Sequence, residues 1–406
     1  MAGKRVLIAG AGIGGLTAAL ALLQRGFDVD VHEQAAALGE IGAGFQVGAN
    51  ASRVLFSLGL EQAIRRVCAV PAGKEVRLWN TGQSWKLFDL GETSVERYGF
   101  PYVMVHRADL HAILVDAVRA LKSSAIHLGS RVERCEHSDD GAALFMEDGR
   151  RVAGDVVVGA DGVHSVVRRD MFGAGDPTFT GCVAWRGLVP AERLPEHLRR
   201  PVGTNWIGPG GHIVHYLVRR GELLNFVAAV ERDGWTVESW SERGSAEECS
   251  REFAGWHADV QTIIGQLDAP YKWALLVREP MTRWSIGHAT LLGDACHPTL
   301  PFLAQGACMA IEDGLVLARC LEAHDDVPTG LAAYEAARID RTSRVVRGSA
   351  ENGRRFHNTT LSDAAQAQRY VDGEWQEKKV EERYDWLFRY DATSVSIEAP
   401  RVRQSA

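Results

Sequence analysis

The feature that most constrains the fold of this chain is a cluster of glycines that follows a short apolar run near the N-terminus. The apolar residues 6–9 predict a buried parallel strand, and the Ala/Leu-rich residues 16–23 predict a helix directly after the glycines. Gly10 permits a tight turn, Gly12 lets the backbone approach a pyrophosphate, and Gly15 allows the helix to pack close to the strand. Since a helix N-terminus also presents free N–H groups to phosphate, this pattern predicts a dinucleotide-binding site.

An acidic residue ends the next predicted strand, over residues 29–32. Glu33 is placed there to accept hydrogen bonds from an adenosine ribose, whereas an arginine would favour a 2′-phosphate. The basic and apolar start of the chain also resembles a signal peptide or a membrane span. Its glycines and the strand that follows argue against both, so we expect a soluble, unprocessed protein.

Composition limits the partners of the chain. With 406 residues, of which 46% are hydrophobic, it can form two or three domain-sized units. A net charge of -7 at pH 7 gives no electrostatic basis for binding nucleic acid or anionic lipid, so a small-molecule partner is expected. The seven cysteines form no CxxC pair, which indicates neither a disulfide framework nor a metal site and fits a reducing cytoplasm.

Two later loops each place an aspartate after a predicted strand. Asp161 follows residues 155–159, and Asp294 follows residues 289–293 ahead of a helix predicted from about 305 to 320. An acid at a strand end can bind ribityl or ribose hydroxyls, and the N-terminus of the next helix can face the pyrimidine edge of a flavin. An ordinary NAD-dependent dehydrogenase does not need the loops with Asp161 and Asp294 or the helix that follows Asp294. The three loops together therefore indicate one tightly bound FAD.

The motifs resemble those of the class A flavoprotein aromatic hydroxylases, the para-hydroxybenzoate hydroxylase family, over roughly residues 4–350. Residues 159–162 look like its DG motif, 293–294 like its GD motif, 105–110 like its HR-x-DL stretch and 334–338 like its YE-x-x-R signature. Residues 293–298 and 304–313 are most similar to the subgroup of salicylate hydroxylase, 3-hydroxybenzoate 6-hydroxylase and 6-hydroxynicotinate 3-monooxygenase. The resemblance implies that Arg107 contacts the flavin nucleotide and that Gln46, Val132 and Ala307 belong to the same cofactor site.

The resemblance also implies a reaction. No second glycine motif has the strand and helix of a separate nucleotide site, so NADH or NADPH would bind transiently on the FAD scaffold as a co-substrate. O2 would then react with reduced flavin to give a C4a-hydroperoxide, which hydroxylates a phenolic aromatic acid. The nearest substrates are 3-hydroxybenzoate and salicylate, in aromatic compound catabolism. The alternatives are a 6-hydroxynicotinate-type hydroxylase and an FAD-dependent dehydrogenase or reductase that does not activate O2.

A phenol accepts electrophilic oxygen readily only as its phenolate, so the site needs a base. On a strand over residues 211–216, alternation puts His212 and Tyr216 on one face and His215 on the other. His212 suits neutral proton transfer and Tyr216 can pass a proton or hydrogen-bond the phenolate, while the structural alternative makes His212 a satisfied sheet residue. Gln46 stands where the hydroxynicotinate enzymes carry a histidine, and glutamine cannot act as a base. Arg186 either pairs with a substrate carboxylate or caps a strand end.

The order of motifs predicts an α/β fold with a Rossmann-like FAD-binding domain of the GR2 type, into which a substrate domain with a mixed β-sheet is inserted. The FAD-binding domain takes residues 1–70, 100–175 and 280–350, and the β-rich domain takes 71–99 and 176–279. Residues 351–406 form a helical C-terminal segment. Its aromatic residues predict docking on its own protein or on a twin subunit in a homodimer, rather than on a membrane.

Overall fold

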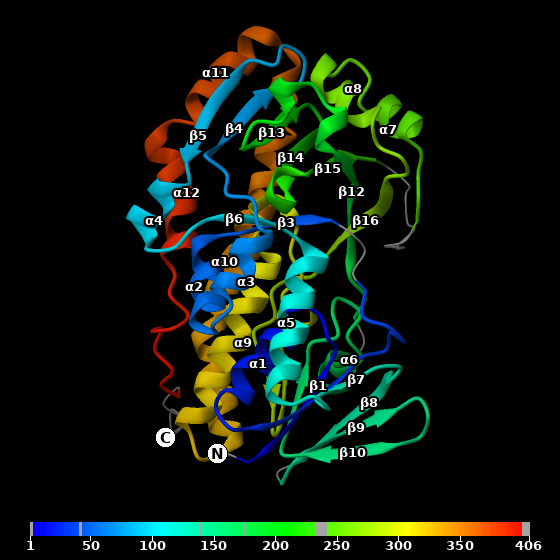
Figure 1. The fold of residues 1–406 in the computed structure, drawn as a ribbon, viewed down its shortest axis with the longest axis vertical. Coiled ribbons are helices and arrows are strands. Elements are labelled where there is room, and N and C mark those ends of the chain that lie inside the picture. The colour runs from blue at the N-terminus through cyan, green and yellow to red at the C-terminus, as the bar shows by residue number, and fades with distance from the viewer. Residues whose placement is uncertain (1–2, 40–42, 139, 174, 233–241, 400–406) are drawn as a thin grey trace, which may run out of the picture.

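A computed structural model describes residues 3–39, 43–138, 140–173, 175–232 and 242–399 of the chain. Two large sheets lie at opposite ends of the molecule in Figure 1, with the long helix α10 (Val327–Phe356) between them. We call them the parallel sheet and the mixed sheet. The predicted α/β fold, with a Rossmann-like part and a mixed-sheet part, is confirmed.

The parallel sheet contains six strands in the order β17-β18-β11-β1-β2-β7. All neighbouring pairs from β18 to β7 are parallel, and only β17 runs antiparallel to its neighbour. The strands are β1 (Arg5–Ala9), β2 (Asp28–His32), β7 (Ile126–His127), β11 (Val156–Gly159), β17 (Ser285–Ile286) and β18 (Ala289–Leu291). Because parallel strands end at one edge, the loops that follow β1, β2, β11 and β18 converge there.

The mixed sheet contains seven strands in the order β16-β12-β15-β14-β13-β4-β5. Only the β13–β4 pair is parallel. The strands are β4 (Gly73–Leu78), β5 (Ser84–Asp89), β12 (Thr178–Pro190), β13 (Val202–Gly208), β14 (Gly211–Val218), β15 (Leu223–Glu231) and β16 (Tyr271–Val277). Strands from residues 71–99 and from 176–279 therefore lie in one sheet.

Two smaller sheets complete the strands of the described chain. One consists of β8 (Val132–His137), β9 (Ala142–Met146) and β10 (Arg151–Gly154), and the other pairs β3 (Gly44–Val47) with β6 (Val103–His106). The helices besides α10 are α1 (Ile13–Leu23), α2 (Ala49–Ser57), α3 (Glu61–Val67), α4 (Glu92–Tyr98), α5 (Arg107–Leu121), α6 (Val166–Phe172), α7 (Ala246–Glu252), α8 (Ala258–Ile264), α9 (Gly306–Ala323), α11 (Ala364–Glu374) and α12 (Glu377–Arg389). Short 3₁₀ turns cover Ala191–Arg193, Glu196–Leu198, Arg219–Gly221, Gly293–Ala295, Pro301–Leu303 and Thr359–Ser362.

Helix α10 and the C-terminal helices connect the two parts. The boundary predicted at residue 350 falls inside α10, which stays helical because Val345, Val346 and Phe356 are buried along one side of it. In α12, Leu387 and Phe388 are buried, and the Phe388 ring lies edge-on to Tyr102 at 5.6 Å in the same chain. The described part of the C-terminal segment thus packs on its own protein, and residues 400–406 of that predicted segment lie outside the described residues.

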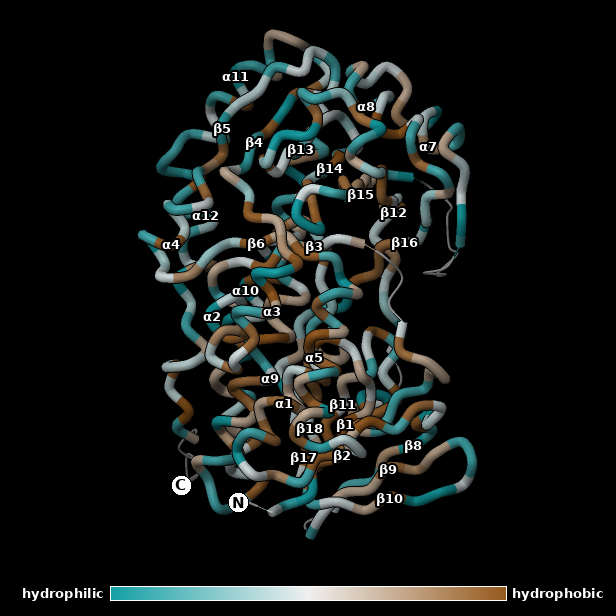
Figure 2. Tube along the Cα trace, viewed as in Figure 1, coloured by the Kyte–Doolittle hydropathy of each residue, from teal (hydrophilic) through white to brown (hydrophobic). Residues whose placement is uncertain are grey.

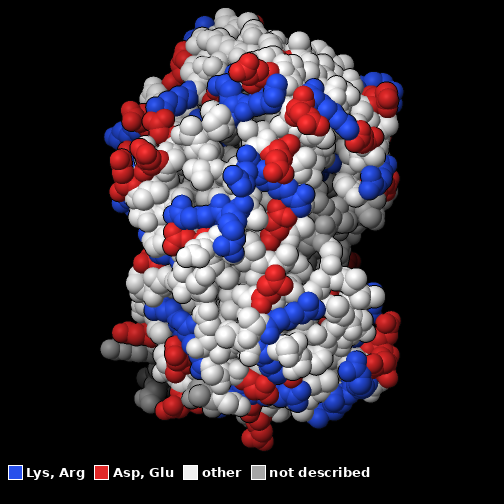
Figure 3. Space-filling view, in the orientation of Figure 1, with Lys and Arg blue, Asp and Glu red and all other residues white. Residues whose placement is uncertain are grey.

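The distribution of apolar and charged residues follows this architecture. In Figure 2 the strands of the parallel sheet are among the most hydrophobic segments, and Val6, Leu7 and Ile8 of β1 are fully buried. On the face shown in Figure 3, basic and acidic side chains are interspersed rather than gathered by sign. Among the described residues, no helix has the length and apolar character needed to cross a bilayer.

Candidate active site

One cavity of about 590 Å³ lies between the converging ends of the parallel sheet and one face of the mixed sheet. All the residues predicted to bind the cofactor or to act in catalysis line it: Gly10, Gly12, Gly15, Glu33, Gln46, Arg107, Val132, Asp161, His212, Tyr216, Asp294 and Ala307. Segments from nearly the whole length of the chain thus meet at one place.

The glycine turn after β1 is packed so closely that side chains are excluded. Gly10 has a φ of +101°, and a Cβ there would lie 2.5 Å from the carbonyl oxygen of Ala160. A Cβ on Gly15 would lie 2.1 Å from the carbonyl oxygen of Gly10. A Cβ on Gly12 would meet nothing within 4 Å, so this residue borders open space in the cavity. The turn therefore leaves room for a ligand above Gly12, at the N-terminus of α1.

Two of the predicted acids are fixed by backbone N–H groups. Glu33 accepts hydrogen bonds from the N–H groups of Ala11 at 2.8 Å and Ala35 at 2.9 Å, which hold its carboxylate beside the glycine turn. Asp161 accepts from Val166 N–H at 2.8 Å and from the Ser165 hydroxyl. Asp161 thus caps the N-terminus of α6 while it lines the cavity, a structural role that the sequence pattern did not reveal.

Asp294 and the start of α9 form the other side of the cofactor end. The Asp294 side chain is exposed within the cavity, and removal from bulk water raises its pKa, an effect that His297 and Arg107 partly oppose. Ala304 (φ 54°) turns the chain into α9, and Gly306 and Ala307 bring the first turn of that helix to the cavity wall. The helix N-terminus offers a partial positive charge to a ligand there.

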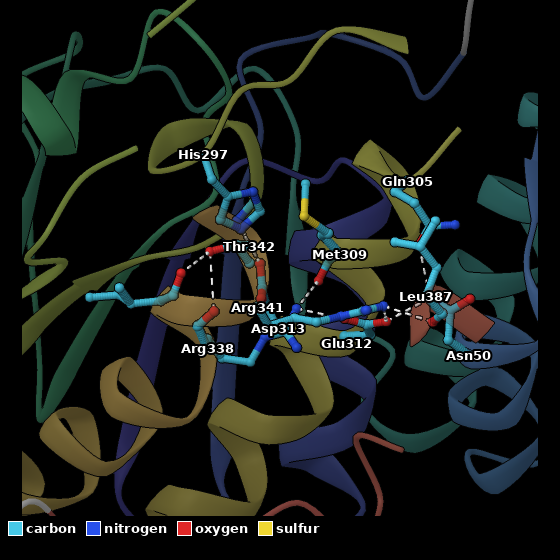
Figure 4. A network of polar contacts seen from close by, with 12 residues as sticks. Asn50, His297, Gln305, Met309, Glu312, Asp313, Arg338, Arg341, Thr342 and Leu387 are labelled. Atoms are coloured by element: carbon cyan, nitrogen blue, oxygen red, sulfur yellow. Dashed lines mark hydrogen bonds and ion pairs between the residues drawn. The ribbon is translucent and has the colours of Figure 1, made fainter. Parts of the chain in front are cut away.

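A buried network of charges holds these loops in place (Figure 4). Asp313 on α9 accepts hydrogen bonds from His297 Nε2 at 2.7 Å, Arg338 Nε at 2.7 Å and Gly293 N–H at 3.2 Å. Although burial raises the pKa of Asp313, His297 and Arg338 outweigh it and leave the pKa below its ordinary value. His297 is therefore engaged by Asp313 behind the loop. Among the described residues, no group of three or more His, Cys, Asp or Glu side chains could hold a metal ion.

Glu312 extends the same network toward α2. It pairs with Arg338 at 2.7 Å and with Arg341 at 3.0 Å, and it accepts a hydrogen bond from Asn50 Nδ2 at 2.6 Å. Asn50 Nδ2 also donates to Gln305 Oε1 at 2.9 Å, which fixes the residue that precedes α9. The network therefore sets the position of the α9 N-terminus.

The late YE-x-x-R signature has a structural explanation in these contacts. The Tyr334 hydroxyl donates to the Leu291 carbonyl at 3.1 Å, and Glu335 accepts from the N–H groups of Trp284 at 2.6 Å and Ser285 at 2.8 Å. With Arg338 bound to Asp313, the signature ties α10 to the strands and loop that carry Asp294.

The mixed sheet supplies the opposite wall. On β14, His212, Val214 and Tyr216 line the cavity, and His215 is buried on the other face, as strand alternation predicts. The His212 ring lies 4.7 Å from the Phe302 ring and 5.1 Å from the Phe356 ring. Burial among these rings lowers the pKa of His212 well below its ordinary value, so His212 is a neutral imidazole at the cavity wall.

Sequence reasoning missed Lys74, a cation that lines the cavity from β4. Its Nζ donates a hydrogen bond to Gln46 Oε1 at 2.9 Å, and the Tyr102 hydroxyl donates to the same oxygen. Desolvation lowers the Lys74 pKa from 10.5 to about 8, and no anionic side chain of the described residues offsets this effect. Lys74 and Glu75 are adjacent and both charged, so the sequence alone gave no sign of which one faces inward.

Arg186 also lines the cavity, with its guanidinium 5.2 Å from the centre of the Trp273 ring. Arg186 lies inside β12, so of the two alternatives left open for it, capping a strand end does not apply.

Comparison with known proteins identifies the family of this chain. A family model described as "FAD binding domain" matches residues 4–349. This chain belongs to the FAD-binding class A flavin monooxygenases. It is an FAD-dependent aromatic monooxygenase, and the glycine turn, the cavity-facing Asp294 and the α9 N-terminus fit its flavin nucleotide.

Relatives of known activity cover almost the whole of this flavin monooxygenase. It is 39% identical to 3-amino-4-hydroxybenzoate 2-monooxygenase PtnB3 of Streptomyces platensis, over 96% of this chain and 97% of that one. It is 36% identical to 6-hydroxynicotinate 3-monooxygenase of Pseudomonas fluorescens, over 99% of both chains. A crystal structure of Klebsiella pneumoniae HpxO complexed with FAD and uric acid matches with a TM-score of 0.79 and 30% identity, over 93% of this chain and 96% of that one.

Proposed function

We propose that this monooxygenase hydroxylates a hydroxybenzoate whose carboxylate and hydroxyl lie apart on the ring, using NADH or NADPH and O2. The observation that carries the proposal is the pairing, in one cavity, of a partly buried, desolvated cation that has no anionic partner among the described side chains and a neutral buried imidazole. A bound carboxylate would satisfy Lys74, and His212 would take the phenol proton.

The register of the mixed sheet separates these two groups. Glu75 is aligned through Thr204 with His215, so Lys74, the residue before it, is level with Tyr216. His212 is four residues along β14 from Tyr216, which is about 13 Å between Cα atoms at the usual strand rise. A substrate that reaches both groups needs its acidic and phenolic ends apart. This favours 3-hydroxybenzoate and 3-amino-4-hydroxybenzoate over salicylate, whose two groups are adjacent.

The proposed cofactor contacts follow the cavity geometry. Gly10, Gly12 and Gly15 would hold the pyrophosphate at α1, Glu33 the adenosine ribose, and Asp294 the ribityl hydroxyls. The remaining contacts to the flavin nucleotide would come from Gln46, Arg107, Val132, Asp161 and Ala307, which line the same cavity. Bound FAD supplies the transfer of electrons from the nicotinamide to O2 and of oxygen to the ring.

The protein supplies orientation, dryness and a proton acceptor. Lys74 and Arg186 orient the acid, while Phe302 and Phe356 keep water from the phenol end. Tyr216, which is level with Lys74, would hydrogen-bond the substrate carboxylate rather than the phenolate, since burial raises its pKa and keeps its hydroxyl protonated as a donor.

The alternative substrate is 6-hydroxynicotinate, on which the relative of Pseudomonas fluorescens acts by name. The contacts of Gln46 disfavour this substrate. Gln46 stands where the hydroxynicotinate enzymes carry a histidine, and here its side-chain oxygen accepts hydrogen bonds from Lys74 and Tyr102.

A substrate panel tests the proposal. Purified holoenzyme is mixed with 3-hydroxybenzoate, 3-amino-4-hydroxybenzoate, salicylate or 6-hydroxynicotinate, and NADH absorbance, O2 uptake, product and CO2 release are followed. We expect coupled hydroxylation of one of the first two compounds, without CO2. Hydroxylation of salicylate or 6-hydroxynicotinate alone would contradict the substrate geometry. NADH oxidation without a hydroxylated product from any of the four would contradict the proposed function.

A further inference from the structure

The imidazole of His212 is the inner end of a chain of side chains that reaches the protein surface. His212 Nδ1 lies 2.7 Å from His357 Nε2, and His357 Nδ1 lies 3.0 Å from Glu231 Oε1. His212 is 2% exposed and the His357 side chain 3%, whereas the Glu231 side chain is 58% exposed. The three residues come from β14, the end of α10 and the end of β15. They join the cavity wall to solvent in two hydrogen bonds.

The exposed carboxylate fixes where the hydrogens lie. A carboxylate can only accept hydrogen bonds, so the contact with Glu231 requires His357 Nδ1 to carry a hydrogen and donate it. A neutral His357 then has a lone pair on Nε2, which accepts from His212 Nδ1–H. The remaining nitrogen, His212 Nε2, is left as a lone pair on a ring that lines the cavity. Glu231 thus prepares His212 to accept a proton.

We infer that His357 and Glu231 form a proton exit path from the substrate cavity, with His212 as its entrance. The inference rests on the proposed function. When a phenol is bound, its proton moves to His212 Nε2 as the O–H bond breaks, and His212 Nδ1 passes its hydrogen to His357 Nε2. His357 Nδ1 passes its own hydrogen to Glu231, from which it leaves to water. Each imidazole gains and loses one proton, and the substrate is left as the phenolate.

Few titratable or charged side chains lie beside the path that could carry the proton in place of His357 and Glu231. The rings of Phe302 and Phe356 pack against His212. His357 is the titratable group that influences the pKa of His212. Glu231 is the charged group that acts on His357, and Cys182 is paired with Glu231 across β12 and β15. Burial lowers the pKa of both histidines, so neither ring keeps a second proton at neutral pH, and a proton that enters the chain is passed on.

The first test needs no substrate. Imidazole ¹⁵N spectra of the holoenzyme at neutral pH should show His212 and His357 both as the Nδ1–H tautomer. In Glu231→Gln the preference at His357 should weaken, because an amide can donate as well as accept. If either histidine of the wild-type enzyme carries its hydrogen on Nε2, the path is refuted, whatever the substrate proves to be.

The second test measures the proton itself. Holoenzyme is mixed with 3-hydroxybenzoate or 3-amino-4-hydroxybenzoate in weak buffer containing a pH indicator, and flavin absorbance reports binding. His357→Gln and Glu231→Gln should bind the probe as the wild type does but release its proton at least about 10-fold more slowly, with the ~10²–10⁴-fold contribution of a positioned base as the upper limit. Added imidazole should restore the rate in His357→Ala.

The matched control is His197→Gln, since His197 Nε2 lies 2.8 Å from Asp259 Oδ1 but does not line the cavity. It should release the proton at the wild-type rate. Normal release from both path variants with bound probe would overturn the inference. If neither probe binds the wild type while both tautomers are as stated, the proposed substrate fails and the hydrogen-bond path stands.

Discussion

Replacing Lys74 with methionine should make the ligand-free enzyme more stable and its binding of aromatic acids weaker. Methionine keeps the length and apolar stem of the side chain but removes the charge. The drop of the Lys74 pKa from 10.5 to about 8 corresponds to at most ~3 kcal/mol of unfavourable charging in the folded protein at neutral pH. Water that reaches the Lys74 side chain in the ligand-free enzyme would reduce this figure. The variant avoids this cost, so its free energy of unfolding should rise by ~1–3 kcal/mol.

The loss in binding follows from the same charge. A hydrogen bond to a charged group contributes about 1.5–3 kcal/mol, so Kd for 3-hydroxybenzoate should rise between ~10-fold and ~150-fold in Lys74→Met. In the wild type, affinity for the acid should fall as pH rises through about 8, where Lys74 loses its proton. Because the folded pKa lies below the unfolded one, wild-type stability should rise with pH between about 8 and 10.5. Both pH effects should be absent in the variant.

The assay compares two ligands and two variants. Binding of 3-hydroxybenzoate and of phenol to the holoenzyme is followed by flavin absorbance, and unfolding is followed in urea. Lys86→Met is the control, since the Lys86 side chain is 68% exposed on the adjacent β5. It should change neither property. If Lys74→Met weakens phenol and the acid equally, or destabilises the protein, Lys74 is not the carboxylate anchor.

The other predictions concern the cofactor end and the base. Gly15→Ala should be purified with little FAD, because its Cβ would lie 2.1 Å from Gly10 O, whereas Gly39→Ala, whose Cβ meets nothing within 4 Å, should keep the flavin-to-protein absorbance ratio. Arg338→Met should lower the urea unfolding free energy by ~3–5 kcal/mol, since it leaves Asp313 and Glu312 short of a partner where neither is exposed; unchanged stability would show that the network is not needed. The lowered pKa values of those two acids predict that wild-type stability is lost as pH falls, and less steeply in Arg338→Met. His212→Ala should slow hydroxylation by ~10²–10⁴-fold between about pH 6 and 9, and an unchanged rate for a phenolic substrate would disprove its role as base.

The cofactor end could be predicted from the sequence because its residues lie at fixed places on regular elements. Gly10, Asp161 and Asp294 each follow an apolar strand, and parallel strands bring their following loops to one edge. His212 and Tyr216 could be assigned to one face because a strand alternates its side chains. These rules are local, so one sequence suffices for them.

The remaining groups depend on contacts that no local rule describes. Lys74 lines the cavity because β4, from residues 71–99, pairs with β13 in a sheet formed mainly by residues 176–279. The register of this pairing cannot be predicted from side-chain alternation, because Lys74 and Glu75 are adjacent and both charged. His357 meets His212 because α10 stays helical past residue 350 and ends beside β14. A histidine at a helix end has no pattern that marks it as a partner.

The position of the exit path follows from the position of the carboxylate anchor. Under the proposed function, an acid held by Lys74 with its phenol at His212 would span the mixed-sheet wall, and its ring would then stand between the phenol proton and the open part of the cavity. Phe302 and Phe356 close the side of the phenol end with apolar surface, which carries no protons. Under the proposed function, His357 with Glu231 then offers the phenol proton a hydrogen-bonded route through the wall. A double variant, Lys74→Met with His357→Gln, separates the two roles. A phenol bound without its anchor can tumble and exchange its proton with cavity water, so proton release should depend less on His357 than it does when Lys74 is present. Equal dependence in both backgrounds would show that the anchor does not seal the cavity.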